Sequence, residues 1–186
     1  MQGIVNQFGS AVVAGYSGAI KLNTFAINIF MTLGSCLSSY TAQNIGAEQK
    51  GRVREGYRAV TIMVLGFAAV ICLALELSGD SLAYLFLGAD GTPAAMQTAV
   101  NCMMFMGWFY CLIGFKMTAD GVLRGAGDMK LFTVANLVNL GIRVLVAVTM
   151  APRFGIFMVW AAVPVGWTAN WLISYCRYRT GKWKKR

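Results

Sequence analysis

Long apolar runs, separated by short charged or glycine-rich connections, dominate the chain. Six such runs extend over residues 1–19, 22–43, 57–77, 98–119, 131–151 and 154–176. A spanning helix needs about 20 mostly apolar residues to cross roughly 30 Å of hydrocarbon. The pattern therefore predicts an all-α, polytopic membrane bundle of about six transmembrane helices, followed by a basic tail over residues 177–186.

The first of these runs is the weakest. Gln2, Asn6, Gln7 and several glycines interrupt it, and no basic residue precedes it. A secretory signal peptide would begin with a positively charged segment, so this run does not fit one. The sequence predicts a shortened first spanning helix instead.

Composition supports a membrane protein and argues against several classes of site. Of the 186 residues, 58% are hydrophobic and only 12% are charged, which lies outside the usual range of soluble domains. The chain has no histidine, and its five cysteines lie inside apolar runs without a Cys-x-x-Cys pair. We therefore expect no disulfide framework, no metal site, no cofactor and no enzymatic activity.

Charge in the connections predicts the orientation. If six segments cross, one face receives the basic residues of the connections 44–56 and 120–130 and of the tail, whereas only Lys21 and Arg153 lie on the other face. The positive-inside rule then predicts a multi-pass protein of the plasma (cytoplasmic) membrane with a cytoplasmic carboxyl terminus. The net charge of +9 comes from basic residues at the membrane ends and in the tail, where anionic lipid headgroups attract them. We therefore expect membrane lipids, and no nucleic acid, as partners.

Polar residues within the fifth run share one helical face. Asn136, Asn139 and Arg143 are spaced i, i+3 and i+7, and Arg143 at membrane depth requires burial against protein or water. Lys116 lies near the end of the fourth run, four residues before Asp120. We interpret Lys116 as snorkelling to the interface within a helical ion pair, and the acidic residues as lying at loop edges.

A milder polar stripe recurs in the second run. It consists of Asn28, Thr32, Ser35, Ser39 and Gln43. Such residues either pack helices closely and hydrogen-bond across them, or line a cavity for a solute, and the sequence leaves both interpretations open. The candidate cavity residues are the polar side chains expected at membrane depth: Asn6, Asn28, Asn101, Asn136 and Arg143.

Two connections carry motifs that resemble those of a known family. Gln43-Asn-Ile-Gly-Ala47 follows the second run, and Leu123-Arg-Gly-Ala-Gly-Asp128 follows the fourth. Both resemble the multidrug and toxic compound extrusion (MATE) family, in which Q-N-x-G-A and L-R-G-x-G-D follow the second and fourth helices of a six-helix lobe. Asn6-Gln-Phe-Gly9, Ile20-Lys-Leu-Asn-Thr-Phe25 and the arginine of the fifth run extend the similarity. The motif positions are Gln43, Asn44, Gly46, Ala47, Leu123, Arg124, Gly125, Gly127 and Asp128.

This resemblance implies the carboxyl-terminal lobe of a two-lobe transporter. It implies export of xenobiotics, amphipathic or cationic small molecules, in exchange for protons or sodium ions, by rocking of two lobes around a cleft. The second lobe would be a missing amino-terminal lobe or a second copy. Residues 98–119 hold no Asp or Glu, so the sequence nominates no carboxylate for coupling.

Two alternatives to efflux stay open at this level. One is a transport-inactive membrane assembly fragment, which a half-length chain would suit. The other is a flippase for lipid-linked oligosaccharides of the same superfamily, whose cavity would need several basic residues for a pyrophosphate headgroup. Only Arg143 lies at depth for that purpose, although Lys116 could turn inward.

Overall fold

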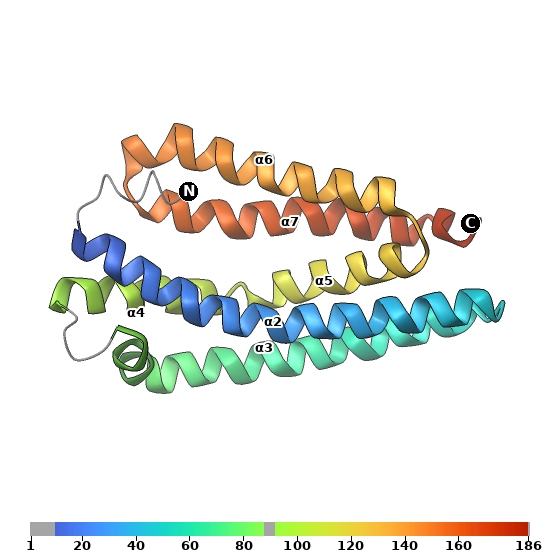
Figure 1. Cartoon of the computed structure of the whole chain (residues 1–186), viewed down its shortest axis with the longest axis horizontal. Helices are drawn as coiled ribbons and strands as arrows, with labels where there is room; N and C mark the ends of the chain where they lie inside the picture. The colour runs from blue at the N-terminus through green and yellow to red at the C-terminus, as the bar shows by residue number, and fades with distance from the viewer. Residues whose placement is uncertain (1–9, 88–91, 186) are drawn as a thin grey trace.

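The fold is a bundle of α-helices (Figure 1), described by a computed structural model for residues 10–87 and 92–185. Within these ranges the chain forms no β-strand, which confirms the all-α class. The helices are α2 Ser10–Gly46, α3 Lys50–Leu87, α4 Pro93–Gly107, α5 Tyr110–Gly125, α6 Met129–Phe154, α7 Phe157–Arg179 and the short 3-10 helix η2 Lys182–Lys185.

Helix α5 lies at the centre of the bundle. It packs against α2 and α3 on one side and against α7 on the other, and it also touches α6. Helices α2, α3 and α4 form one layer, and α6 and α7 pair to form a second (Figure 1). The carboxyl terminus lies at the end of the bundle where α2 meets α3, and we call this end the basic end.

The structure moves the first predicted boundary. Helix α2 runs without a break from Ser10 to Gly46, so the end of the first predicted span and the whole second span belong to one helix. Lys21, placed by the sequence pattern in a connection, is exposed on this helix. The reason is local, because residues 19–22 read Ala-Ile-Lys-Leu, which contains no residue that stops a helix.

The predicted span 98–119 is not one straight helix. Its residues are divided between α4 and α5, which meet at an angle of 52° around Trp108 and Phe109. Helix α4 begins earlier than predicted because Thr92 caps it, accepting a hydrogen bond of 3.3 Å from the Ala95 amide, with Pro93 at the first position. Helix α3 bends at Ser78, close to the predicted end of its span.

Among the residues that the structure describes, three helices are long and apolar enough to cross a membrane: α2 over Val13–Gly46, α3 over Lys50–Leu85 and α6 over Met129–Phe154. The bent pair of α4 and α5 gives a fourth crossing if it counts as one span. Helix α7 does not join this group, although the sequence predicted a span there. Its buried residues include Asn170 and Ser174, which suits a helix sheltered from lipid by its neighbours.

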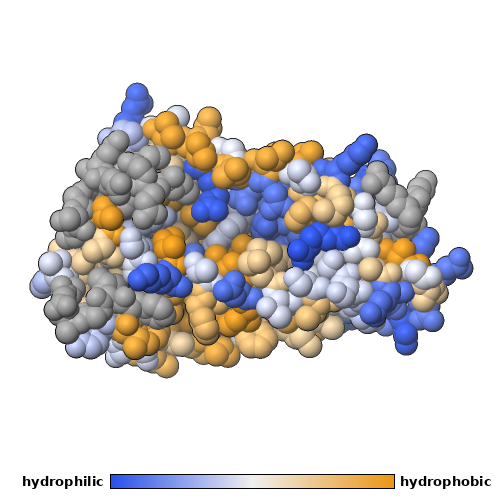
Figure 2. Space-filling model, viewed as in Figure 1, coloured by the Kyte–Doolittle hydropathy of each residue, from blue (hydrophilic) through white to orange (hydrophobic). Residues whose placement is uncertain are grey.

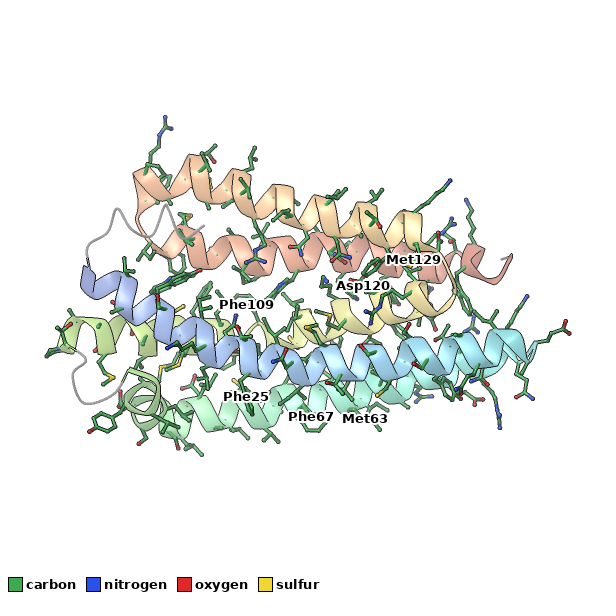
Figure 3. The ribbon with its side chains drawn as sticks, viewed as in Figure 1. Phe25, Met63, Phe67, Phe109, Asp120 and Met129 are labelled. Carbon is green, nitrogen blue, oxygen red and sulfur yellow. The ribbon has the colours of Figure 1, made fainter. Side chains whose placement is uncertain are left out.

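Apolar side chains cover much of the outside of the bundle. Phe25 on α2 is 67% exposed, and Met63 and Phe67 on α3 point outward beside it (Figure 3). Hydrophobic side chains follow the edges of the view along α6 and along α3, whereas hydrophilic ones gather at the basic end (Figure 2). A surface of this kind would aggregate in water, so hydrocarbon is its natural solvent.

Helices α2 and α5 approach each other backbone to backbone. A Cβ atom on Gly121 of α5 would lie 2.5 Å from the carbonyl oxygen of Gly34 on α2, and one on Gly34 would lie 2.7 Å from the carbonyl oxygen of Met117. Small residues permit such contacts in membrane bundles, where close packing replaces the hydrophobic effect as the source of association. This contact fixes α5 against α2.

The basic tail is part of the folded lobe. Helix α7 continues to Arg179, and η2 then folds back so that Trp183 is only 2% exposed. The Trp183 indole Nε1 donates a 2.9 Å hydrogen bond to the Tyr178 carbonyl, and its ring packs in a cluster with Leu37, Val53 and Val122. Helix α7 thus continues three residues past the predicted end of its span at residue 176, and the following segment packs against the lobe.

Replacing Trp183 by alanine should release this segment. Truncating a buried Trp costs about 3–5 kcal/mol, and here the loss falls on a terminal segment that can detach by itself. We expect trypsin to cleave the purified variant after its last arginines roughly a hundredfold faster than the wild type. Trp108→Ala is the matched control, because Trp108 is 67% exposed. Equal cleavage of both variants would contradict a docked tail.

Candidate functional site

A buried ion pair lies on the central helix. Lys116 Nζ is 2.9 Å from Asp120 Oδ2, and the two side chains are only 7% and 2% exposed. The predicted helical pair is therefore confirmed, but the interpretation of Lys116 as snorkelling to the interface is wrong. Helix α5 extends beyond Ala119 to Gly125 and is covered by four neighbouring helices, so both charges end inside the bundle.

Side chains of α6 and α7 complete a network around this pair. Lys116 Nζ donates a 3.0 Å hydrogen bond to Asn136 Oδ1, and Asn136 Nδ2 lies 3.5 Å from Asp120 Oδ2. Ser174 Oγ donates a 2.6 Å hydrogen bond to Asp120 Oδ1, from the side of α7 (Figure 3). Both carboxylate oxygens thus have partners, as a buried charge requires.

Asn170 extends the network by one helical turn of α7. Its side chain is fully buried, with Oδ1 3.4 Å from Ser174 Oγ, and its Nδ2 group has no hydrogen-bond partner among the described residues. A buried donor without a protein partner is a place for a water molecule or another acceptor. The sequence analysis missed Asn170 and Ser174, although their i, i+4 spacing within an apolar run was a readable signal.

We call this cluster of Lys116, Asp120, Asn136, Asn170 and Ser174 the α5–α7 network. The Lys116 ammonium lies between two oxygen atoms, Asp120 Oδ2 and Asn136 Oδ1, where a small monovalent cation would also find ligands. A proton on Asp120 would likewise remove the negative charge that holds Lys116. In the described parts of the chain, no group of three or more His, Cys, Asp or Glu residues could hold a metal ion.

Arg143 lies farther along α6, on the same inward face. It is half-buried, and a Cβ atom on Gly166 of α7 would lie 2.7 Å from its Cγ and would also meet Asn139 Oδ1. Tyr16 of α2 lies close enough to interact with it electrostatically. The common face predicted for the polar residues of α6 is therefore confirmed, while leucines such as Leu137 and Leu145 are exposed on its outer side.

The polar stripe on α2 faces outward from this lobe. All five of its residues are exposed: Asn28, Thr32, Ser35, Ser39 and Gln43. The Thr32 hydroxyl donates a 2.9 Å hydrogen bond to the Asn28 carbonyl, and Arg124 Nη2 lies 3.5 Å from Ser35 Oγ. Apart from the contact of Ser35 with Arg124, the stripe does not pack against other helices of the described lobe, and the cavity interpretation stays a prediction. Hydrophilic side chains also gather between α2 and the α6–α7 layer (Figure 2).

Two further candidate residues do not join these groups. Asn101 is exposed on α4, where its Oδ1 accepts a 2.9 Å hydrogen bond from Gln97 Nε2. Asn6 lies outside the described residues. Of the five candidates, the structure brings Asn136 to the α5–α7 network and Arg143 to the same face of α6, and places Asn28 on the exposed stripe of α2.

The first motif, residues 43–47, forms the corner between α2 and α3. Asn44 is buried, its Nδ2 donates a 2.8 Å hydrogen bond to the Tyr40 carbonyl, and its own carbonyl accepts from the Gln49 amide at 2.8 Å. Gly46 ends α2, but the residue with positive φ in this corner is Glu48, at 60°. Gln43 and Ala47 are exposed.

The second motif, residues 123–128, fastens the corner between α5 and α6. Leu123 is fully buried, Gly125 packs against the Ser38 carbonyl of α2, and Gly127 has a φ of 72° that favours glycine. Asp128 is buried and pairs with Arg177 Nε of α7 at 2.6 Å. Both motifs thus connect helices, and neither forms a binding cradle among the residues described.

Comparison with known proteins identifies a matching family model and a solved structure of similar fold. Residues 1–149 match the family model MatE. The chain is 27% identical over 188 residues to the probable multidrug resistance protein YpnP of Bacillus subtilis (strain 168) and 24% identical over 185 residues to YoeA of the same strain. It is 22% identical over 127 residues to the multidrug resistance protein NorM of Vibrio parahaemolyticus.

Similarity to YpnP and YoeA covers nearly this whole chain, but the alignments cover less than half of each relative. The alignments with YpnP and YoeA cover 97% and 98% of this chain, yet 40% and 39% of those proteins, whereas the NorM alignment covers 68% and 27%. A solved structure of a MOP superfamily transporter from Pyrococcus furiosus superposes with a TM-score of 0.86 at 20% identity, over 97% of this chain and 40% of that one. The fold is therefore that of part of such a transporter.

Proposed function

Since the chain belongs to the MatE family, we propose that it is one lobe of a membrane transporter that exports amphipathic or cationic small molecules in exchange for protons or sodium ions. Its similarity to proteins named for multidrug resistance supports the class of substrate. The chain spans about 40% of the length of its curated relatives, so the other half of the cleft would come from an amino-terminal lobe or a second copy.

The exposed polar stripe of α2 is the observation that carries this proposal. Asn28, Thr32 and Ser35 project from a helix that is otherwise apolar enough to cross a membrane. The Thr32 hydroxyl bonds the backbone of its own helix, but lipid chains offer the Asn28 side chain no hydrogen bonds, so Asn28 would lie against water or another protein. A water-filled cleft between two lobes supplies that environment and gives the solute its path.

The proposed orientation places the basic end in the cytoplasm. The corner between α2 and α3 and the end of α7 carry most of the arginines and lysines, and Figure 2 shows hydrophilic residues at this end. Positively charged connections favour the cytoplasmic side of the plasma membrane.

Asp120 is the residue that we propose for coupling, although the sequence analysis nominated none. Its carboxylate is compensated by Lys116, so uptake of a proton, or of a sodium ion in place of the ammonium, would free Lys116 from Asp120 and Asn136. Because the network joins α5 to α6 and α7, that release would loosen the contact between the two layers. The bound cation would thereby favour one arrangement of the helices.

The flippase alternative receives less support. Its cavity would need several free basic groups for a pyrophosphate, but Lys116 is engaged by Asp120 and Asn136 and does not turn toward the stripe of α2. Arg143 is then the basic residue left at depth on the inward face of α6. A transport-inactive assembly fragment remains the competing proposal and is decided by reconstitution.

Replacing Asn28 by leucine should reduce transport without harming the fold. Its side chain is exposed and makes no hydrogen bond in the described lobe, so the variant should accumulate in the membrane like the wild type. A leucine would remove a polar contact from the cleft, and we expect roughly a tenfold loss of gradient-driven dye movement in proteoliposomes.

Leu145→Ala is the control, because Leu145 is exposed on the outer side of α6 and its variant should transport normally. A full-length relative reconstituted in the same way supplies the positive control. Dye movement by the relative but not by this chain would support the assembly fragment. Equal transport by the Asn28 and Leu145 variants would contradict a solute path along α2.

A further inference from the structure

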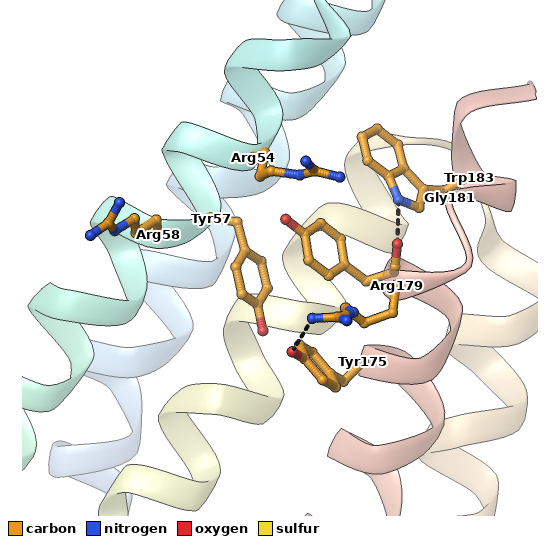
Figure 4. A pocket seen from close by; sticks show the side chains of 8 residues that line it. Arg54, Tyr57, Arg58, Tyr175, Arg179, Gly181 and Trp183 are labelled. Atoms are coloured by element: carbon orange, nitrogen blue, oxygen red, sulfur yellow. Dashed lines mark hydrogen bonds between the residues drawn. The ribbon is translucent and has the colours of Figure 1, made fainter.

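A pocket with basic and aromatic walls lies between α3 and the end of α7 (Figure 4). It has a volume of about 510 Å³. Helix α3 contributes Arg54, Tyr57 and Arg58, and α7 with the turn to η2 contributes Tyr175, Tyr178, Arg179, Gly181 and Trp183. None of these residues belongs to the α5–α7 network or to the polar stripe of α2.

Stacked aromatic rings form the floor of the pocket. Tyr57 and Tyr178 stack with ring centroids 4.3 Å apart, and Trp183 stacks on the far side of Tyr178 at 6.0 Å. The buried Trp183 is held by its hydrogen bond to the Tyr178 carbonyl (Figure 4). The docked tail therefore builds one wall, and a rigid aromatic floor holds the cationic groups around a fixed space.

Three arginines line the pocket, with the Arg54 guanidinium directed toward the aromatic floor and that of Arg58 directed away from it (Figure 4), and no carboxylate lines the pocket among the residues described. Arg179 lies over the Tyr175 ring at 6.0 Å, and Arg54 lies within electrostatic reach of the Tyr178 hydroxyl. Arg58 makes no hydrogen bond or ion pair with the described residues. Glu55 lies beside Lys50 and Gly51 in a separate hollow of α3, which it shares with Arg54 and Arg58.

We propose that this pocket binds a phosphate group, presented either by an anionic phospholipid or by a soluble phosphate. Guanidinium groups match phosphate oxygens with two parallel hydrogen bonds, and Arg54 and Arg179 present theirs to a pocket that no described carboxylate lines. Tyrosine and tryptophan rings suit the boundary between headgroups and acyl chains, where one side of the ring is apolar and the other is wet. The inference does not depend on transport.

The position of the pocket fits a headgroup. Arg54 and Arg58 lie within the first turns of α3, only about 6 and 12 Å along the helix from Lys50, where the membrane span of that helix begins. Arg179 is the last residue of α7. Basic pockets between helices at the cytoplasmic side are typical places for anionic lipid headgroups, and the proposed orientation puts this one there.

Binding to the purified full chain in detergent tests the proposal. Short-chain phosphatidylglycerol, short-chain phosphatidylcholine, glycerol phosphate and inorganic phosphate would each be titrated, with intrinsic fluorescence and thermal unfolding as readouts. We expect phosphatidylglycerol to bind at least tenfold more tightly than phosphatidylcholine. Arg54→Gln should weaken that binding roughly tenfold, because the Arg54 guanidinium points into the pocket (Figure 4) and one charge-assisted contact is lost.

Arg52→Gln is the matched control, since Arg52 is an exposed arginine of the same helix that does not line the pocket. Its binding should stay within about twofold of the wild type. If inorganic phosphate and glycerol phosphate bind as tightly as the lipid and depend equally on Arg54, the phosphate site is supported and its ligand is soluble. Equal losses in the two variants, or no binding in any titration, would overturn the proposal.

Discussion

Replacing Asp120 by asparagine is expected to destabilise the lobe and to abolish transport. The change leaves the Lys116 ammonium buried, 7% exposed, without the carboxylate 2.9 Å away that balances it. Removing one partner of a buried ion pair costs about 3–5 kcal/mol of unfolding free energy. We expect lower abundance in the membrane and a lower midpoint of thermal unfolding in detergent.

The double variant Lys116→Met/Asp120→Asn separates stability from coupling. It removes both charges together, and a methionine preserves most of the volume of the lysine stem, so abundance and unfolding temperature should recover to near the wild type. Gradient-driven transport should remain lost, because no carboxylate is left to bind the coupling cation. The amount of each variant in the membrane must be measured together with its transport activity.

Recovery of transport together with abundance in the double variant would contradict coupling through Asp120. The pair would then be structural, joining α5 to α6 and α7, and the α5–α7 network would carry no part of the mechanism. A control for the network itself is Ser174→Ala, which removes the 2.6 Å hydrogen bond to Asp120 Oδ1 but leaves both charges in place. Ser174→Ala should lower the free energy of unfolding by less than Asp120→Asn does, by about 1–3 kcal/mol.

Replacing Gly121 by alanine should destabilise the lobe. The added methyl group would lie 2.5 Å from the Gly34 carbonyl oxygen, which belongs to the backbone of α2 and has no rotamer with which to move away. Helices α2 and α5 must then separate along their contact. Overpacking of this kind costs about 1–3 kcal/mol, and more when the obstacle is backbone.

Gly141→Ala is the matched control for that experiment. Gly141 also lies within a helix, α6, but a Cβ atom there meets nothing within 4 Å. Alanine is a better helix former than glycine by about 1 kcal/mol, so this variant should be unchanged or slightly more stable. The measurement is the thermal unfolding midpoint of both variants in the same detergent. Equal midpoints would show that the close approach of α2 and α5 does not constrain the lobe.

Several features of the lobe follow from local patterns in the sequence. The apolar runs indicated the all-α membrane class because hydrocarbon imposes a length of about 20 residues on each crossing. The spacing of Asn136, Asn139 and Arg143 predicted a common face of α6, since a helix repeats every 3.6 residues. The two corner motifs indicated the family to which residues 1–149 match.

Helix limits were harder to predict, for local reasons. The break at Trp108–Phe109 lies inside an apolar run without proline, so hydropathy shows no sign of it. Conversely, Lys21 suggested a loop, but one charge on a helix surface does not end a helix. The surroundings of Lys116 were misjudged because its distance from the end of the run was counted along the sequence, without the helices that cover α5.

The sequence by itself determined that the chain is a helical membrane protein of this family, because length, hydropathy and motifs are local properties of the chain. Only the tertiary structure decided which polar groups meet. It brought Asp120, Asn136 and Ser174 together from three helices, turned the stripe of Asn28 outward, and docked Trp183 beside Tyr178. Contacts between residues far apart in sequence depend on how helices cross, and that follows from packing at positions such as Gly34 and Gly121.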